Sequence, residues 1–165
     1  MAGSNSLLLG ALAIGVVAGM RSMMAPTMTS WTLAARSDTE DMDQPARALA
    51  APYTRLLLTP LAASEILGDK LPFAPDRTVK ASMAVRVLSG GVSAAALAGA
   101  QRQPILFPAF IGATAAYVST KVAIDLRKHY ASSSVLTNAA LGLAEDAMAL
   151  SIGCRGLKHA FTFRH

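Results

Sequence analysis

Five long apolar stretches, separated by short polar segments, constrain the fold of this chain more than any other feature of its sequence. They run over residues Ser6–Ala25, Tyr53–Lys70, Met83–Ala100, Ile105–Ile124 and Val135–Cys154. A helix that crosses a membrane needs about 20 mostly apolar residues, with about 17 as the lower limit. The pattern therefore predicts an all-α fold, a multi-pass transmembrane bundle of about five helices.

The low content of charged residues supports lipid as the surrounding solvent. Only 15% of the 165 residues are charged and 53% are hydrophobic, whereas a typical soluble domain carries about 25% charged residues. The length suits one domain, which we place over residues 1–165. The net charge of +5 is spread singly between apolar runs. We therefore expect the lipid bilayer, and no nucleic acid, as a partner.

The first apolar stretch starts near the beginning of the chain, but no basic residue precedes it. We therefore interpret it as a retained membrane helix rather than a signal peptide. Its apolar character continues to Ala35, and Gly19 and Pro26 bracket a place where the helix can break. Four acidic residues follow within residues 36–52, where we expect an acidic loop in water. The Lys and Arg residues divide almost equally between the two sides of such a bundle, so they do not fix its orientation.

Two pairs of similar segments suggest an internal repeat. Residues 13–22 (AIGVVAGMRS) resemble 110–119 (FIGATAAYVS), and residues 61–65 (LAASE) resemble 141–145 (LGLAE). The first two apolar stretches would then correspond to the last two. Because one stretch lies between the two pairs, the second copy would be inverted in the membrane, as in many secondary transporters. Chance similarity among Ala- and Gly-rich helices is the alternative explanation.

Ionisable residues in or at the end of the apolar stretches are the candidate site residues. They are Arg21, Glu65, Asp69, Lys70, Glu145 and Asp146. A charge at the centre of a bilayer costs about 2.5 to 3.5 kcal/mol, so such residues face protein or water and find partners. Glu65 and Asp69 share a helix face and repel each other unless a cation, a proton, Lys70 or an Arg of another helix intervenes. Asp146 is displaced about 100° from Glu145, so both should not face one partner.

These charges favour a polar centre made by Arg21, Glu65 and Glu145 that binds a proton, a cation or a small polar solute. The leading expectation for the whole chain is a transporter-like protein that moves such a ligand. The alternative is a membrane scaffold or accessory subunit in which the same charges pair helices. The sequence holds no catalytic motif, so we do not expect an enzyme.

Two further patterns point to packing. The stripe of Met20, Met23, Met24 and Met28 could bind a soft metal, but such stripes more often fill cores. With one cysteine and no histidine within the apolar stretches, we predict no metal site and no cofactor. Residues 89–100 (SGGVSAAALAGA) are small enough for close helix packing or for a homo-oligomer.

Several spaced motifs resemble one protein family. They are G-x-R-S-x-x-x-P (Gly19, Arg21, Ser22, Pro26), E-x-x-x-D-K-x-P (Glu65, Asp69, Lys70, Pro72), D-R (Asp76, Arg77), R-x-x-x-G (Arg86, Gly90) and E-D (Glu145, Asp146). Together they span most of the chain and resemble small bacterial integral-membrane proteins grouped as domain of unknown function 4126. The resemblance implies a multi-pass protein of the bacterial inner membrane and gives weight to the motif residues. It implies no activity, and the acidic segment 36–52 is not part of the pattern.

Overall fold

The first apolar stretch forms two helices rather than one. In the computed structural model, which describes residues 2–36, 39–68, 80–130 and 135–161, helix α1 ends at Met20 and helix α2 begins at Met24. The predicted break between Gly19 and Pro26 is therefore confirmed. Pro26 lies in the first turn of α2, where the missing N–H of proline loses no intrahelical hydrogen bond.

The described part of the chain is all-α. Its helices are α1 (Ala2–Met20), α2 (Met24–Ala34), α3 (Ala46–Ala50), α4 (Pro52–Gly68), α5 (Lys80–Gly99), α6 (Leu106–Tyr130) and α7 (Val135–Phe161), with a 3-10 turn η1 (Thr39–Asp41). The second to fifth predicted helices are confirmed as α4 to α7. The last two continue beyond their apolar stretches, because the polar residues that follow stay helical.

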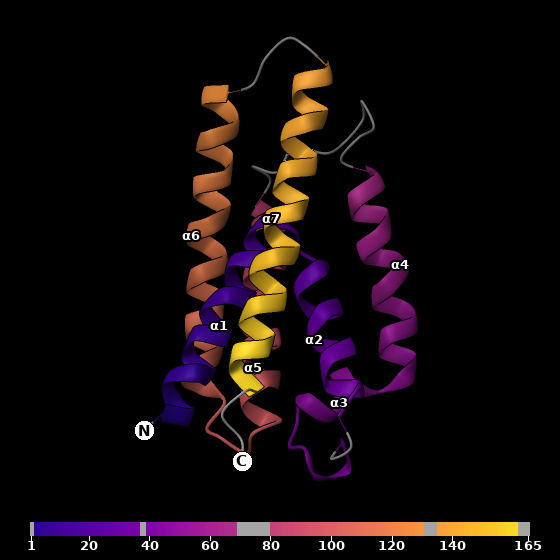
Figure 1. The fold of residues 1–165 in the computed structure, drawn as a ribbon, viewed down its shortest axis with the longest axis vertical. Helices are drawn as coiled ribbons and strands as arrows, with labels where there is room; N and C mark the ends of the chain where they lie inside the picture. Colours follow the sequence, from indigo (N-terminus) through magenta and orange to yellow (C-terminus); the bar gives the residue numbers. More distant parts are fainter. Residues whose placement is uncertain (1, 37–38, 69–79, 131–134, 162–165) are drawn as a thin grey trace.

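The chain reverses its direction at the break between α1 and α2. Val17 of α1 and Met28 of α2 both lie beside Gly153 of α7. Arg21, at the break between them, contacts Asp146, which lies nearer to the start of α7 than Gly153 does. Thus α1 runs antiparallel to α7, α2 runs parallel to it, and the two form a helical hairpin. Helix α1 begins and helix α7 ends at the same end of the bundle (Figure 1).

This reversal contradicts the predicted inverted-topology repeat. Gly15 of α1 lies against Gly112 of α6, and Gly19 lies against Ser119, so α1 and α6 run in the same direction. An inverted repeat requires these two helices to be antiparallel. The prediction is wrong because it counted the first apolar stretch as one crossing, and the turn at Arg21–Met23 adds a reversal.

Small residues bring α1, α5 and α6 into close contact at the centre of the bundle. A Cβ atom built on Gly112 of α6 would lie 2.5 Å from the carbonyl oxygen of Gly90 in α5. Ala94, Ala96 and Ala98 of α5 are fully buried. The close packing predicted for residues 89–100 is therefore confirmed, within one chain. A homo-oligomer stays a prediction, and it would need another face.

The acidic segment 36–52 is not a loop apart from the bundle. Its acids Asp41 and Asp43 are exposed, as expected. Its apolar residues Met42 and Leu49, however, are buried in a second cluster between α2 and α5. The expectation of a loop in water is right for Asp41 and Asp43 and wrong for these apolar residues, which pack against α2 and α5.

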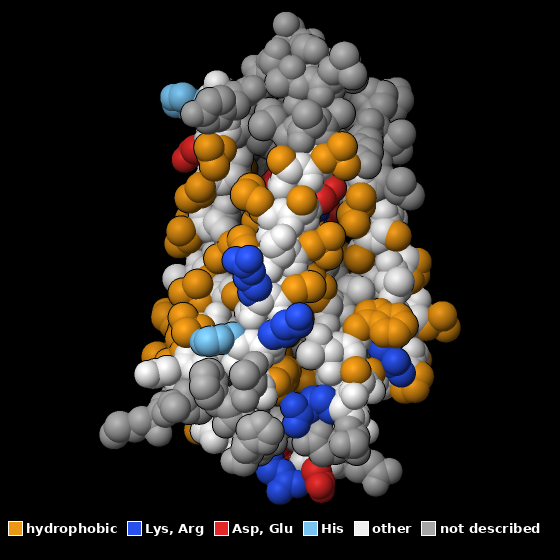
Figure 2. All heavy atoms as spheres, in the orientation of Figure 1, with side chains coloured by type: hydrophobic (Ala, Val, Ile, Leu, Met, Phe, Trp, Pro, Cys, Tyr) orange, Lys and Arg blue, Asp and Glu red, His pale blue; other side chains and the backbone are white. Residues whose placement is uncertain are grey.

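The outer surface carries many large apolar side chains. Leu56 of α4 is 76% exposed and Phe110 of α6 is 70% exposed. Hydrophobic side chains cover much of the middle of the face seen in Figure 2, and Lys and Arg side chains lie mainly in its lower half. Two segments of the described chain, Ala81–Gly99 and Leu106–Leu126, are long and apolar enough to cross a membrane, judged by length and composition.

Candidate functional site

The turn Arg21–Met23, which we call the hairpin tip, lies inside the bundle rather than at its end. It is level with Thr120 of α6 and Asp146 of α7, each of which is at least ten residues from either end of its helix. A helix end leaves N–H or C=O groups without intrahelical partners, and buried groups of this kind need partners from the protein. Side chains of three other helices, α4, α5 and α6, supply them here.

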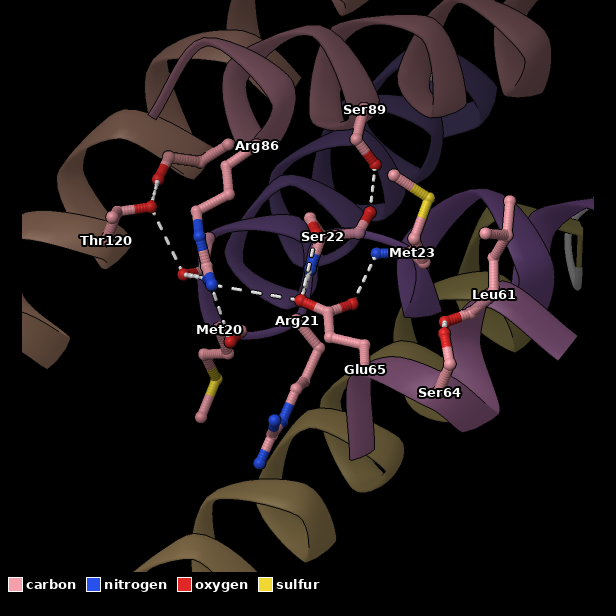
Figure 3. Close-up of polar contacts among 12 residues, drawn as sticks. Met20, Arg21, Ser22, Met23, Leu61, Ser64, Glu65, Arg86, Ser89 and Thr120 are labelled. Carbon is pink, nitrogen blue, oxygen red and sulfur yellow. Dashed lines mark hydrogen bonds and ion pairs between the residues drawn. The ribbon is translucent and has the colours of Figure 1, made fainter. Parts of the chain in front are cut away.

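Glu65 of α4 accepts hydrogen bonds from the backbone N–H groups that lack intrahelical partners at the start of α2. Its Oε1 accepts hydrogen bonds from the backbone N–H and the hydroxyl of Ser22, both at 2.8 Å. Its Oε2 accepts the backbone N–H of Met23, also at 2.8 Å (Figure 3). Glu65 therefore does from another helix what an N-cap residue does within its own helix. Its negative charge also suits the positive end of the helix dipole.

Arg86 of α5 donates hydrogen bonds to the free carbonyl groups at the end of α1. Its Nη1 donates to the carbonyl oxygens of Gly19 and Met20, at 2.7 and 2.9 Å. The hydroxyl of Thr120 donates to the Gly19 carbonyl as well, at 3.1 Å. A cation suits the negative end of the α1 dipole. Because Arg86 Nη2 lies 3.8 Å from Glu65 Oε1, the two capping charges also face each other.

The side chain of Arg21 points away from Glu65, toward α7 (Figure 3). Its Nε lies 2.6 Å from Oδ1 of Asp146, and Arg21 is only 1% exposed. On the other side of the tip, the hydroxyl of Ser89 in α5 donates to the carbonyl oxygen of Ser22. The hairpin tip is therefore held from opposite sides by charged and polar side chains.

The structure brings together part of the predicted site. Glu65 and Arg21 both lie at the hairpin tip, but Glu65 binds Ser22 and Met23, and the Arg21 side chain points away from it to Asp146. The expected contact of Arg21 with Glu65 is therefore not observed, and the printed ion pair of Arg21 is with Asp146, which lies about 100° from Glu145 around α7. Glu145 is also buried and has a polar interaction of its own. Asp69 and Lys70 lie outside the described residues, so their part in the site stays a prediction.

Arg86 is the main residue that the sequence prediction missed. It lies inside the third apolar stretch, so the rule that selected Arg21 would have selected it too. Its role could not be predicted from a paired acid in the sequence, because two of its partners are backbone carbonyls. The R-x-x-x-G spacing of Arg86 and Gly90 was the available signal.

The fold and the site define an all-α bundle in which a helical hairpin ends on buried, charged side chains. The family model of domain of unknown function 4126 matches residues 8–163, and the chain belongs to this family. The match includes the hairpin tip and every described residue of the site, so the resemblance to this family is confirmed. No curated protein and no solved structure matches the chain.

Proposed function

We propose that this protein is a multi-pass protein of the bacterial inner membrane that binds and moves a small solute or ion at the hairpin tip. The observation that carries the proposal is a charged centre inside a bundle with an apolar exterior. Arg21 and Arg86 are 1% and 4% exposed, whereas large apolar residues face outward. Such a distribution is unfavourable in water and favourable in lipid, where ionisable residues face the bundle interior.

In this proposal α1 and α2 form a re-entrant hairpin, and α4 to α7 cross the membrane. The described helices then make four crossings, with the start of α1 and the end of α7 on the same side. This arrangement replaces the five crossings expected from the sequence. Non-helical backbone at membrane depth is tolerated where it lies against protein, and in the hairpin tip Arg21 is buried while Ser22 and Met23 are half-buried.

Interrupted helices near the membrane midplane are where many secondary transporters bind their ligands. Helix N-termini there face anionic groups, and carbonyls at helix C-termini coordinate cations. In this protein Glu65 occupies the first position and Arg86 the second. We interpret the structure as a closed state in which the protein's own charges fill the site. A proton on Glu65, or an anionic group in its place, would release the start of α2.

Flux measurements on the purified protein in liposomes test the transport proposal. We expect the wild-type protein to move protons or a small charged solute down an imposed gradient, followed with an enclosed pH dye or with labelled solute. Glu65→Gln should remain folded and lose at least about tenfold in flux, a factor worth roughly 1.4 kcal/mol. Lys121→Gln, a substitution at an exposed position of α6, is the matched control and should keep wild-type flux.

The scaffold alternative has an observation of its own in its favour. The charges at the tip already have partners, among them Arg21 with Asp146 and Glu65 with two backbone N–H groups. A scaffold predicts no flux in the wild type, and Glu65→Gln would then release a co-purifying partner. Lower thermal stability of this variant is expected under both proposals, because Glu65 binds the start of α2. If folded Glu65→Gln and Glu145→Gln variants keep wild-type flux, the site is not where transport occurs.

A further inference from the structure

We propose that a second site, at the lower end of the bundle, binds the phosphate group of an anionic phospholipid. The site is a cavity of about 580 Å³ between the end of α2, α3 and the start of α4. Thr39, Arg47, Pro52 and Arg55 line it, together with three alanines. This volume lies within the range of small-molecule sites in proteins. The cavity shares no lining residue with the hairpin tip.

The residues that line the cavity favour an anion. Two of them, Arg47 and Arg55, are arginines, and none of the lining residues that the structure describes is acidic. The planar guanidinium group offers several N–H donors in a geometry that matches phosphate oxygens. The proposal does not require Arg47 to be free, because Arg47 also has a polar interaction elsewhere.

Arg55 provides the sharper evidence. Its Nε is buried and has no hydrogen-bond partner within the described part of the chain. Its guanidinium carbon lies 5.3 Å from the centre of the Trp31 ring, which holds one face of the group. Because Nε is closed off from solvent, a ligand in the cavity would meet the outer N–H groups of this guanidinium, which forms part of the cavity wall. Phosphate oxygens are suitable acceptors for such N–H groups.

The start of α4 adds to this preference. The helix is 17 residues long and begins at Pro52, which lines the cavity. The positive end of its dipole therefore opens toward the site, and helix N-termini favour anions such as phosphate. The effect reinforces the two arginines and would not make a site without them.

The surroundings of the cavity favour a lipid as the source of the phosphate. Trp31 and Tyr53 are 53% and 66% exposed close to Arg55, and such aromatic residues gather at the headgroup level of membranes. Leu56 and Leu57 follow Arg55 directly and are 76% and 63% exposed. A lipid with its phosphate in the cavity would lay its acyl chains along this face of α4. Basic pockets between helices bind anionic headgroups in this manner. The inference rests on the membrane placement proposed above and is independent of transport.

Native mass spectrometry of the protein in detergent tests the site. We expect the wild type to retain phosphatidylglycerol in preference to phosphatidylcholine with the same acyl chains. Arg47→Gln and Arg55→Gln should each weaken this retention about fivefold, the effect of roughly one basic residue near an anionic headgroup. Arg102→Gln is the matched control, because Arg102 lies at the same end of the bundle, contacts Asp41 and does not line the cavity. It should retain phosphatidylglycerol as the wild type does.

A second arm identifies the source of the phosphate. Inorganic phosphate at millimolar concentration is added to the same protein, and thermal unfolding is followed. Protection by inorganic phosphate but not by phosphatidylglycerol would uphold the phosphate chemistry and overturn the lipid source. The site is overturned if Arg47→Gln, which changes an exposed residue and should fold, retains phosphatidylglycerol like the wild type. The proposed site is also wrong if Arg102→Gln loses as much phosphatidylglycerol retention as Arg47→Gln and Arg55→Gln. Because the readout is binding, a failure to detect flux would leave this result unchanged.

Discussion

The chain reverses its direction at a turn inside the bundle and at a turn at its exposed end. Comparing the two turns shows how burial changes the hydrogen-bond partners that the backbone of a turn needs. Between α5 and α6, at the end of the bundle, the backbone N–H groups of Gln101 and Gln103 both donate to the carbonyl oxygen of Ala98, at 2.9 and 3.0 Å. Arg102 completes this turn with a positive φ of 53°. The turn Arg21–Met23 reverses the chain in the interior, and its backbone groups depend on side chains from α4, α5 and α6.

The difference lies in the solvent. Backbone groups at the exposed turn that lack a protein partner can bind water, so local bonds and one backbone bond from the Asp43 N–H to the Gly99 carbonyl are enough. At the hairpin tip each group left without a partner costs about 1 to 3 kcal/mol. The charged residues there are therefore needed for the turn itself. Substitutions at the tip should cost much more stability than substitutions at the α5–α6 turn.

The largest effect is expected for Arg86→Met. This change leaves the carbonyls of Gly19 and Met20 without their main donor and Glu65 without its cation. Removing one partner of a buried charge pair costs about 3 to 5 kcal/mol, so we expect a strong drop in thermal stability. Thermal unfolding in detergent, followed by circular dichroism, measures it. The control Arg155→Met changes an exposed Arg of α7 and should unfold like the wild type.

If Arg86→Met unfolds at the wild-type temperature, the tip does not need its caps and the comparison with the exposed turn is wrong. A folded but less stable protein with intact flux would separate the two roles of the site. It would assign Arg86 to structure and leave transport to Glu65.

The next prediction compares two Arg–Asp ion pairs, one buried and one exposed. Asp146→Asn should cost about 3 kcal/mol, because it removes the charge that lies 2.6 Å from the buried Arg21. Adding Arg21→Gln should cost less than the sum of the single changes, giving a coupling above about 1 kcal/mol. The pair Arg102–Asp41, at 3.1 Å with side chains 59% and 77% exposed, should give a coupling of about 1 kcal/mol or less. Double-mutant cycles on thermal unfolding measure both, and equal couplings would show that burial is not the deciding factor.

Glu65→Gln should have a smaller effect on stability. The amide keeps one oxygen that accepts a hydrogen bond, but its NH2 group turns toward a backbone donor of Ser22 or Met23. One lost hydrogen bond in a buried site costs about 1 to 3 kcal/mol. Hydrogen exchange followed by mass spectrometry should then show faster exchange in the peptide that contains the tip. Ser64→Ala, one residue away on an exposed position of α4, should leave exchange unchanged.

The sequence predicted most helices because apolar length and polar interruptions suffice to place them. The stretches that became α4 to α7 were located within a few residues at their starts. Gly19 and Pro26 also predicted the break correctly. The direction after the break could not be predicted, because a kinked helix and a hairpin have the same apolar pattern. What decides between them is contact with distant residues such as Gly153 and Glu65.

The same reasoning explains what was found and missed at the site. Arg21, Glu65 and Asp146 stood out because each charge lies in apolar surroundings in the sequence. The pairing of Arg21 with Asp146 rather than Glu145 depends on how α7 is rotated, which neighbouring helices determine. The burial of Met42 in the acidic segment depends likewise on tertiary contacts, because the acids around it suggest water.

The smallest effect is expected for Arg102→Gly at the exposed turn. A positive φ costs a residue with a side chain about 1 to 2 kcal/mol, which glycine avoids. Glycine loses about 0.5 to 1 kcal/mol through its greater freedom in the unfolded chain, and the exposed contact with Asp41 contributes about 0 to 1 kcal/mol. These terms nearly cancel, so thermal unfolding should stay within about 1 kcal/mol of the wild type. A loss as large as that of Arg86→Met would mean that the exposed turn is as demanding as the buried one, and that depth does not explain where this chain places its charges.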